Sequence, residues 1–407
     1  MARSLGLAAY RALAQRREAT FEPPDTPRPK GELIWLHAAE PESMLAVQDL
    51  AKRLCGNRQE ATALITGPDN KTPVPVTSDG TILHGALPGE HPQAVAAFLA
   101  HWRPDVCVWL WGGLRPNLIL EASKAKIPLF LVNADTGGFD ARRDRWLPDL
   151  TRQLLSRFRA IIARSPAAQR RLTGLGPAKG DIGLAAPILA GGQALACIDS
   201  DLADLGAAMG GRPAWFATAV LPKELPVVLT AHRGAMRWSH RLLLILNPAH
   251  PEDRESMTEA LTESGLSHIC WDEGQFPDDN TQVLITEDRA SWGLFFRVAP
   301  VSFMGSTLIQ GEKGCDPLDA AALGSAVLYG PRVRQYMQSY SRLAAAGAAR
   351  IVNDADALAT AVSRLIAPDQ AATMAHAGWE VVSEGAAVMD RIVEMVQDAL
   401  DEAGQAA

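Results

Sequence analysis

The sequence predicts an α/β protein built from two parallel, doubly wound sheets. At 407 residues the chain exceeds what one ordinary core supports, so two domains of roughly 200 residues are expected. Continuous apolar runs alternate with helical patterns along both halves, which is typical of buried parallel strands joined by helices. Glycine pairs at 191–192 and 210–211 separate the halves, and we expect the domain boundary there.

Apolar runs in the first half predict strands that alternate with helices. Helical patterns cover 44–54, 92–102 and 117–125, and Pro92 suits a first helical turn. The strands are expected at 33–37, 62–66, 106–110, 128–132 and 160–163, with a short one near Ile182.

The second half repeats this pattern and ends in helices at 354–365 and 386–402. Its strands are expected at 214–218, 242–246, 283–285, 301–303 and 326–328. Two Rossmann-like domains facing across a cleft, closed by a long helix, describe the GT-B architecture, in which ligands bind beyond the carboxyl ends of the strands. The expected divisions are a helix and connector at 1–32, an acceptor-side domain at 33–190, a linker at 191–213, a donor-binding domain at 214–385 and a final helix at 386–407.

Composition excludes several classes of protein. The net charge of −7 argues against a general nucleic-acid binder. No Gly-x-Gly-x-x-Gly follows the first strand and no Gly-Lys-Ser/Thr loop is present, which disfavours NAD and ATP enzymes. Neither a run of about 18 apolar residues nor a signal peptide is found. The scattered cysteines suit a reducing cytoplasm and argue against a Cys-rich zinc site, and we expect neither metal nor cofactor; they are Cys55, Cys107, Cys197, Cys270 and Cys315.

The N-terminal segment is basic and weakly amphipathic. Leu5, Ala9 and Leu13 fall on one helical face, and the segment 1–17 contains four arginines and no acid. Such a helix can rest on an anionic membrane surface, or it can be a surface helix packed on its own domain. The sequence leaves both open.

Residues 303–331 hold the most informative segment. An apolar run ends in Gly305, Ser306 and Thr307, a glycine-rich loop follows, and Asp316 and Asp319 open an alanine-rich helix. This order is typical of the donor pocket of a nucleotide-sugar glycosyltransferase, because small residues and a helix N-terminus let backbone N–H groups approach a phosphate. The two carboxylates could hold ribose or sugar hydroxyls. Alternatively, the small residues form a tight turn and the acids cap the helix.

Ordered, co-linear blocks resemble the Kdo transferases of lipopolysaccharide synthesis. The segment 34–39 looks like that family's first strand, 114–119 resembles its Leu-Trp-Pro-Asn-Leu-Ile, and 132–134 its Val-Asn-Ala. The segment 244–252 resembles its Pro-Arg-His-Pro-Glu block and 305–331 its donor loop. The resemblance implies metal-independent, inverting transfer of 3-deoxy-D-manno-octulosonic acid (Kdo) from CMP-Kdo to a lipid A precursor. It also implies a peripheral protein at the cytoplasmic face of the inner membrane.

The chain departs from the family where the family places its catalytic base. The family's loop after the first strand reads Ser-Val-Gly-Glu, and here Ser43 stands at the position of that Glu. Glu40 and Glu42 are the carboxylates of this loop, and either could act as the base if the loop is shifted, with Glu42 favoured. Alternatively both acids only favour the dipole of the helix that Ser43 caps.

Other departures remove cations from the donor pocket. Ala249 and Cys315 replace an Arg and a His of the family, and Asp135 replaces the Arg of its Asn-Ala-Arg. Each charge-assisted bond to a phosphate is worth about 1.5–3 kcal/mol, so these changes weaken the expected donor affinity. His250 remains and is expected near the donor, or else bonded to the stiff turn around it.

A basic cluster after Gly137 and Gly138 provides candidate acceptor contacts. Arg142, Arg143 and Arg145 could bind the phosphates of a lipid A acceptor, or they could form a solvated helix face. Two functions stay open. One is an active transferase of Kdo or a related sugar acid, and the other is a catalytically degenerate paralogue that acts as a binding or regulatory protein.

Overall fold

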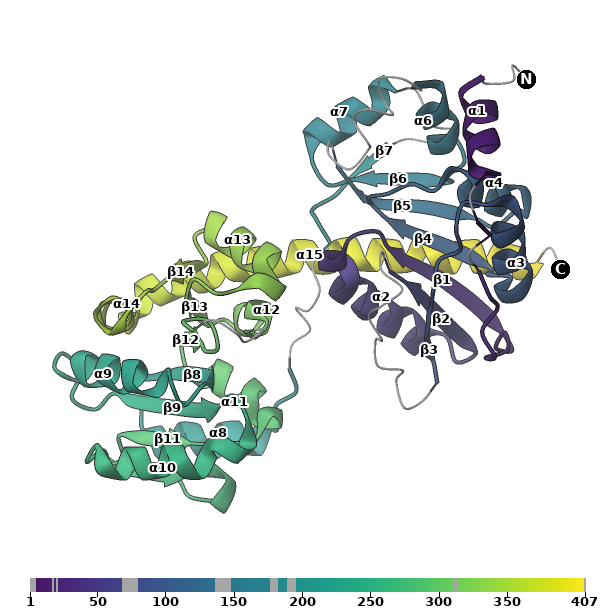
Figure 1. Cartoon of the computed structure of the whole chain (residues 1–407). Helices are drawn as coiled ribbons and strands as arrows, with labels where there is room; N and C mark the ends of the chain where they lie inside the picture. Colours follow the sequence, from purple (N-terminus) through teal and green to yellow (C-terminus); the bar gives the residue numbers. More distant parts are fainter. Residues whose placement is uncertain are drawn as a thin grey trace. The chain divides into compact units, whose positions relative to one another are not determined.

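The computed structural model describes residues 5–16, 18–19, 21–67, 80–135, 148–175, 182–188, 195–309 and 314–405. It forms two compact units, unit 1 (1–190 with 385–407) and unit 2 (191–384). Each unit holds a parallel seven-stranded sheet with helices on both faces, which confirms the predicted fold class (Figure 1).

The sheet of unit 1 has the strand order β3-β2-β1-β4-β5-β6-β7. The order reverses between β1 and β4, so the loops after these two strands lie at a topological switch point, where doubly wound folds bind ligands. The strands are β1 (Glu32–Ala38), β2 (Ala61–Thr66), β3 (Ile82–Gly85), β4 (Val106–Leu110), β5 (Leu129–Ala134), β6 (Ala160–Ala163) and β7 (Ile182–Leu184).

Two apolar layers enclose this sheet. Leu33, Trp35 and Trp109 point to a layer formed with α1, α3, α4, α6 and α7, while Ile34 and Leu36 point to a layer formed with α2 and the last turns of α15. Alternate residues of one strand thus serve opposite faces, which explains why the strands are apolar throughout. The helices are α1 (Leu5–Ala14), α2 (Met44–Asn57), α3 (Pro92–Trp102), α4 (Pro116–Lys124), α6 (Pro148–Leu155) and α7 (Pro166–Gly174).

The sheet of unit 2 has the order β10-β11-β9-β8-β12-β13-β14. Its switch point lies between β8 and β12, so the loops after these strands are the expected ligand-binding edge. The strands are β8 (Ala214–Val220), β9 (Leu243–Pro248), β10 (His268–Cys270), β11 (Val283–Ile285), β12 (Val301–Met304), β13 (Ala326–Tyr329) and β14 (Ala349–Ile351).

Helices cover both faces of this second sheet as well. Trp215 packs in the layer of α9, α10 and α14, whereas Phe216 contacts the aromatic rings of Trp292, Phe295 and Phe296 on the opposite face. The helices are α8 (Asp199–Met209), α9 (Leu225–Met236), α10 (Arg254–Glu263), α11 (Trp292–Val298), α12 (Pro317–Ala322), α13 (Met337–Ala345) and α14 (Ala355–Leu365).

Two expected divisions of the chain look different in the structure. The final helix α15 (Pro368–Gln405) starts 18 residues before the expected 386, and its residues through Glu384 belong to unit 2. The helical pattern between the glycine pairs of the expected linker at 191–213 is helix α8, which buries Leu205 and Met209, packs on α11 and so belongs to unit 2.

The N-terminal helix packs on its own unit. Tyr10 and Ala14 are buried in the core layer, and Arg11 pairs with Glu121 of α4 at 3.0 Å, whereas Leu13 is 61% exposed. The described part of the chain has no helix long and apolar enough to cross a membrane.

Candidate catalytic and donor-binding sites

In unit 1, the loops after β1 and β4 bring Glu40 to the switch point. Gly112 adopts a φ of +124°, and a Cβ there would lie 2.8 Å from the Ala39 Cβ and 3.6 Å from Oε1 of Glu40. A side chain at 112 would therefore collide with the loop that holds Glu40. The glycine leaves room for the half-buried carboxylate at the carboxyl edge of the sheet.

The other two residues of this loop begin the following helix. Pro41–Ser43 forms a single 3₁₀ turn, in which Ser43 N–H donates to the Glu40 carbonyl at 3.1 Å. Ser43 is buried and precedes α2, but its hydroxyl makes no capping hydrogen bond. The side chain of Glu42 lies outside the described part of the structure, and the choice of base between the two acids stays a prediction.

Unit 1 also buries two titratable groups that the sequence did not single out, His37 in β1 and Glu90. His37 hydrogen-bonds Thr66 through Nδ1 at 2.9 Å and packs on Trp109, and burial, with a smaller effect of Arg115, lowers its pKa to about 3. The imidazole is therefore neutral and supplies no positive charge. A buried histidine at the end of a strand has no local signature that separates it from a core residue.

The second group, Glu90, ties helix α1 to this edge. Its carboxylate accepts hydrogen bonds from Tyr10 Oη at 3.0 Å and from the backbone N–H of Asn117, at the start of α4, at 2.8 Å. Burial raises its pKa, and these hydrogen bonds oppose the rise. This contact favours the reading of α1 as a helix packed on its own domain.

The candidate acceptor arginines Arg142, Arg143 and Arg145 lie outside the described residues, and their role stays a prediction. Asp135, which stands where the resembling family has an Arg, forms an ion pair with Arg164 just after β6. The carboxylate at this position is thus neutralised within unit 1.

In unit 2, the loop after β12 packs directly on the end of β8. Gly305 N–H donates to the Thr218 carbonyl at 2.8 Å, and a Cβ at 305 would lie only 2.4 Å from that oxygen. Ser306 follows with a φ of +57°, and its hydroxyl donates to the Ala219 carbonyl at 2.7 Å. Thr307 is fully buried and its hydroxyl accepts from Gly330 N–H at 2.7 Å. The small residues therefore build a fixed turn at the switch point.

A buried carboxylate occupies the backbone donors of this turn. Glu224, which is 0% exposed, accepts from Ser306 N–H at 2.6 Å and from Leu308 N–H at 2.8 Å. A third, longer bond comes from Leu221 N–H at 3.2 Å. The N–H groups that the sequence suggested for a phosphate are thus satisfied inside the protein. The side chain responsible lies 82 residues away in the chain, so sequence pattern alone did not identify it.

The start of α12 holds the two candidate acids, Asp316 and Asp319. Asp316 caps the helix by accepting from Leu318 N–H at 3.0 Å, as the capping alternative predicted. Burial raises the pKa of Asp319 to about 6, and Arg289 opposes this rise. Cys315 is buried 3.5 Å from the Thr218 hydroxyl, and burial raises the pKa of its thiol to about 12, so it is not a nucleophile.

His250 is exposed at the carboxyl end of β9. Its backbone carbonyl accepts from Asp253 N–H at 3.0 Å, and its side chain makes no capping bond. The residue is therefore placed at the ligand-binding edge, and its contact with a donor stays a prediction.

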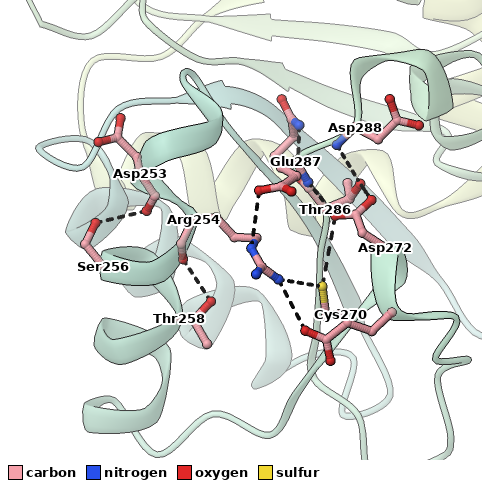
Figure 2. Close-up of polar contacts among 11 residues, drawn as sticks. Asp253, Arg254, Ser256, Thr258, Cys270, Asp272, Thr286, Glu287 and Asp288 are labelled. Atoms are coloured by element: carbon pink, nitrogen blue, oxygen red, sulfur yellow. Dashed lines mark hydrogen bonds and ion pairs between the residues drawn. The ribbon is translucent and has the colours of Figure 1, made fainter.

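Beside it, Figure 2 shows a polar cluster around Arg254, which sequence reasoning missed. The guanidinium donates to Cys270 Sγ at 3.2 Å and pairs with Glu273 and Glu287, each at 3.3 Å. Asp272 accepts from the Thr286 hydroxyl at 2.9 Å and so fixes the loop after β11. Arg254 thus links the loops after β9, β10 and β11.

Arg289 is a second arginine that sequence reasoning missed. It follows β11, and its Cζ lies 4.5 Å from the ring centroid of Trp292, a cation–π distance. Its charge acts on Asp319, Cys315 and Tyr336, so the guanidinium lies near the start of α12.

Comparison with known proteins shows which family the chain resembles. Residues 11–188 match the model of the family described as 3-deoxy-D-manno-octulosonic-acid transferase (kdotransferase). The 3-deoxy-D-manno-octulosonic acid transferase of Haemophilus influenzae is 24% identical over 400 residues, covering 96% of this chain and 92% of that protein. The chain is thus similar to Kdo transferases over nearly its whole length. The transferase of Bordetella pertussis is 25% identical over 394 residues, covering 91% of this chain and 88% of its own length.

A solved structure supports the fold. Acinetobacter baumannii MurG superposes with a TM-score of 0.52 at 13% sequence identity, covering 90% of this chain and all of that chain. At this identity the likeness concerns the fold alone. It agrees with the two Rossmann-like units of this chain.

Proposed function

We propose that this protein is a glycosyltransferase that moves Kdo, or a related sugar acid, from a CMP-activated donor to a lipid A precursor. The observation that carries the proposal is the similarity to Kdo transferases over nearly the whole chain, together with a carboxylate, Glu40, at the switch point of unit 1. The transfer proceeds with inversion and without a metal. The protein acts as a peripheral protein on the cytoplasmic face of the inner membrane.

The chemistry requires a base on unit 1. An acceptor hydroxyl attacks the anomeric carbon of Kdo on the face opposite the phosphate, so that the C–O bond to CMP breaks as the new C–O bond forms. Glu40, or Glu42 of the same loop, accepts the hydroxyl proton at a carboxylate oxygen within hydrogen-bond reach. The arginines Arg142, Arg143 and Arg145 bind acceptor phosphates.

Unit 2 binds the donor at its own switch point. Gly305, Ser306 and Thr307 form the floor of this site, because their turn is fixed by Glu224. Asp319 accepts hydrogen bonds from ribose or sugar hydroxyls, and Asp316 keeps the helix start in place beside it. His250 approaches from the loop after β9.

One observation favours a second function. The phosphate-facing N–H groups of Ser306 and Leu308 are already bonded to Glu224, and Ala249 and Cys315 supply no charge. A degenerate paralogue that binds a ligand or partner without catalysis fits this arrangement as well.

Release of CMP separates the two functions. Purified protein is incubated with CMP-Kdo and a lipid A precursor, alongside Glu40→Gln and Glu42→Gln, with Glu259→Gln on the exposed face of α10 as a control. Turnover that one loop substitution abolishes and the control leaves intact supports the transferase and names its base. No turnover by the wild-type protein, with no CMP-Kdo binding by calorimetry, would favour the paralogue.

A further inference from the structure

A CMP-activated sugar acid carries a phosphate and a carboxylate, and a site for it needs a positive charge. This inference rests on the function proposed above. Ala249 and Cys315 stand at two positions where the resembling family has cationic residues, and the buried thiol of Cys315 stays uncharged. Because Glu224 already bonds the N–H groups of Ser306 and Leu308, the loop after β12 does not replace the missing cations.

Two arginines in the loops after β9 and β11 of unit 2 differ in their partners. Arg254 bonds Cys270, Glu273 and Glu287, so two carboxylates already pair with its charge. Arg289, two residues beyond Glu287, has no ion-pair or hydrogen-bond partner among the residues that the structure describes, although it is exposed. An arginine that has no carboxylate partner at such an edge can bind a carboxylate of a ligand.

The ring of Trp292 supports the Arg289 side chain. The Cζ of its guanidinium lies over the ring of Trp292, 4.5 Å from the centroid, and Trp292 is itself 4% exposed. Trp292 packs edge-on against Phe216 of β8 and Phe296, with centroids 6.3 and 6.0 Å apart. A guanidinium in contact with an aromatic ring still has N–H donors for bidentate bonds to phosphate and carboxylate.

Arg289 also lies near the predicted donor contacts at the start of α12. It is the cation that acts on Asp319, and its charge reaches Cys315 and Tyr336. The loop after β11 and the start of α12 therefore meet at the same edge. An anion between them would contact the guanidinium on one side, while its attached sugar or ribose hydroxyls reach Asp319 on the other.

We propose that Arg289, stacked on Trp292, is the anion-binding residue of the donor site and receives an oxyanion of the donor. The shared chemistry is a bidentate bond to two oxygens, from either the CMP phosphate or the sugar-acid carboxylate. The residue lies on a different element from the positions 249 and 315, so the positive charge has moved within the site rather than been lost.

Calorimetry on the full-length protein tests this with CMP, cytidine and free Kdo as probes. Arg289→Ala should weaken binding of the probe that carries the oxyanion at least tenfold and leave cytidine affinity unchanged. Arg289→Lys should recover part of the loss, because it keeps the charge without the fork. Arg350→Ala, an exposed arginine on β14, is the matched control and should bind like the wild type.

The outcomes are separable. Loss of CMP affinity assigns the phosphate, and loss of Kdo affinity assigns the carboxylate. Wild-type binding of CMP or Kdo that Arg289→Ala changes by less than twofold overturns the assignment while the proposed function stands. A wild-type protein that binds neither probe overturns both, and unchanged cytidine affinity in the variant shows that its site is folded.

Discussion

The buried carboxylate of Glu224 makes a quantitative prediction about the donor loop. In Glu224→Gln the amide keeps one oxygen, so it can retain either the bond from Leu308 or the pair from Ser306 and Leu221. Its NH₂ group then faces backbone donors in a site that is 0% exposed. Hydrogen bonds to charged groups contribute about 1.5–3 kcal/mol each, so losing at least one should lower the free energy of unfolding by about 2–3 kcal/mol.

Equilibrium unfolding in urea, followed by tryptophan fluorescence, measures this effect. With a slope of about 2–3 kcal/mol per molar urea, the transition that reports unit 2 should move down by about 1 M. Glu259→Gln, on an exposed position of α10, is the matched control and should stay within about 0.5 kcal/mol of the wild type. A Glu224→Gln transition that coincides with that of the control would refute the claim that this carboxylate fixes the loop.

Three further predictions follow from neighbouring residues. Gly305→Ala should destabilise the protein by about 3 kcal/mol or more, because its Cβ would lie 2.4 Å from a carbonyl oxygen, whereas Gly206→Ala in α8 meets no atom within 4 Å; equal melting temperatures would contradict this. Burial raises the pKa of Asp319 from 3.8 to about 6, so its carboxyl holds its proton more tightly in the folded protein, and its contribution to stability should fall by up to about 3 kcal/mol between pH 4 and 6 and stay lower above pH 6. Urea unfolding at several pH values should show that Asp319→Asn abolishes this fall. A pH profile that the substitution leaves unchanged would argue against it. Cys315, with a thiol pKa of about 12, should resist iodoacetamide in the folded protein at pH 8 while half-buried Cys197 reacts, and peptide mapping that finds Cys315 alkylated first would contradict its burial.

The sequence was sufficient for the central strands of both sheets. Strands such as β1 and β8 are buried along their whole length on both faces, so they read as continuous apolar runs. Strands β3, β10 and β14 were not predicted. Each lies at or next to a sheet edge, is only three or four residues long, and has few buried positions, so it carries no apolar run.

The candidate site was predictable in place but not in its contacts. Because parallel strands end at one edge, the sequence could place Glu40 after β1 and Gly305 after β12. It could not show that Glu224 bonds a loop 82 residues away, or that Arg289 stacks on Trp292 and lies near Asp319. Those relations arise from the packing of separate segments, and neither residue has a local pattern that marks it.

Mass spectrometry of the acceptor after incubation with CMP-Kdo tests the central claim most directly. The account predicts that the wild-type protein converts a lipid A precursor to a species heavier by at least one Kdo residue, and that omission of CMP-Kdo prevents this. If the precursor keeps its mass after prolonged incubation with folded protein and intact CMP-Kdo, the transferase proposal is contradicted. The protein would then be a paralogue that binds without catalysis.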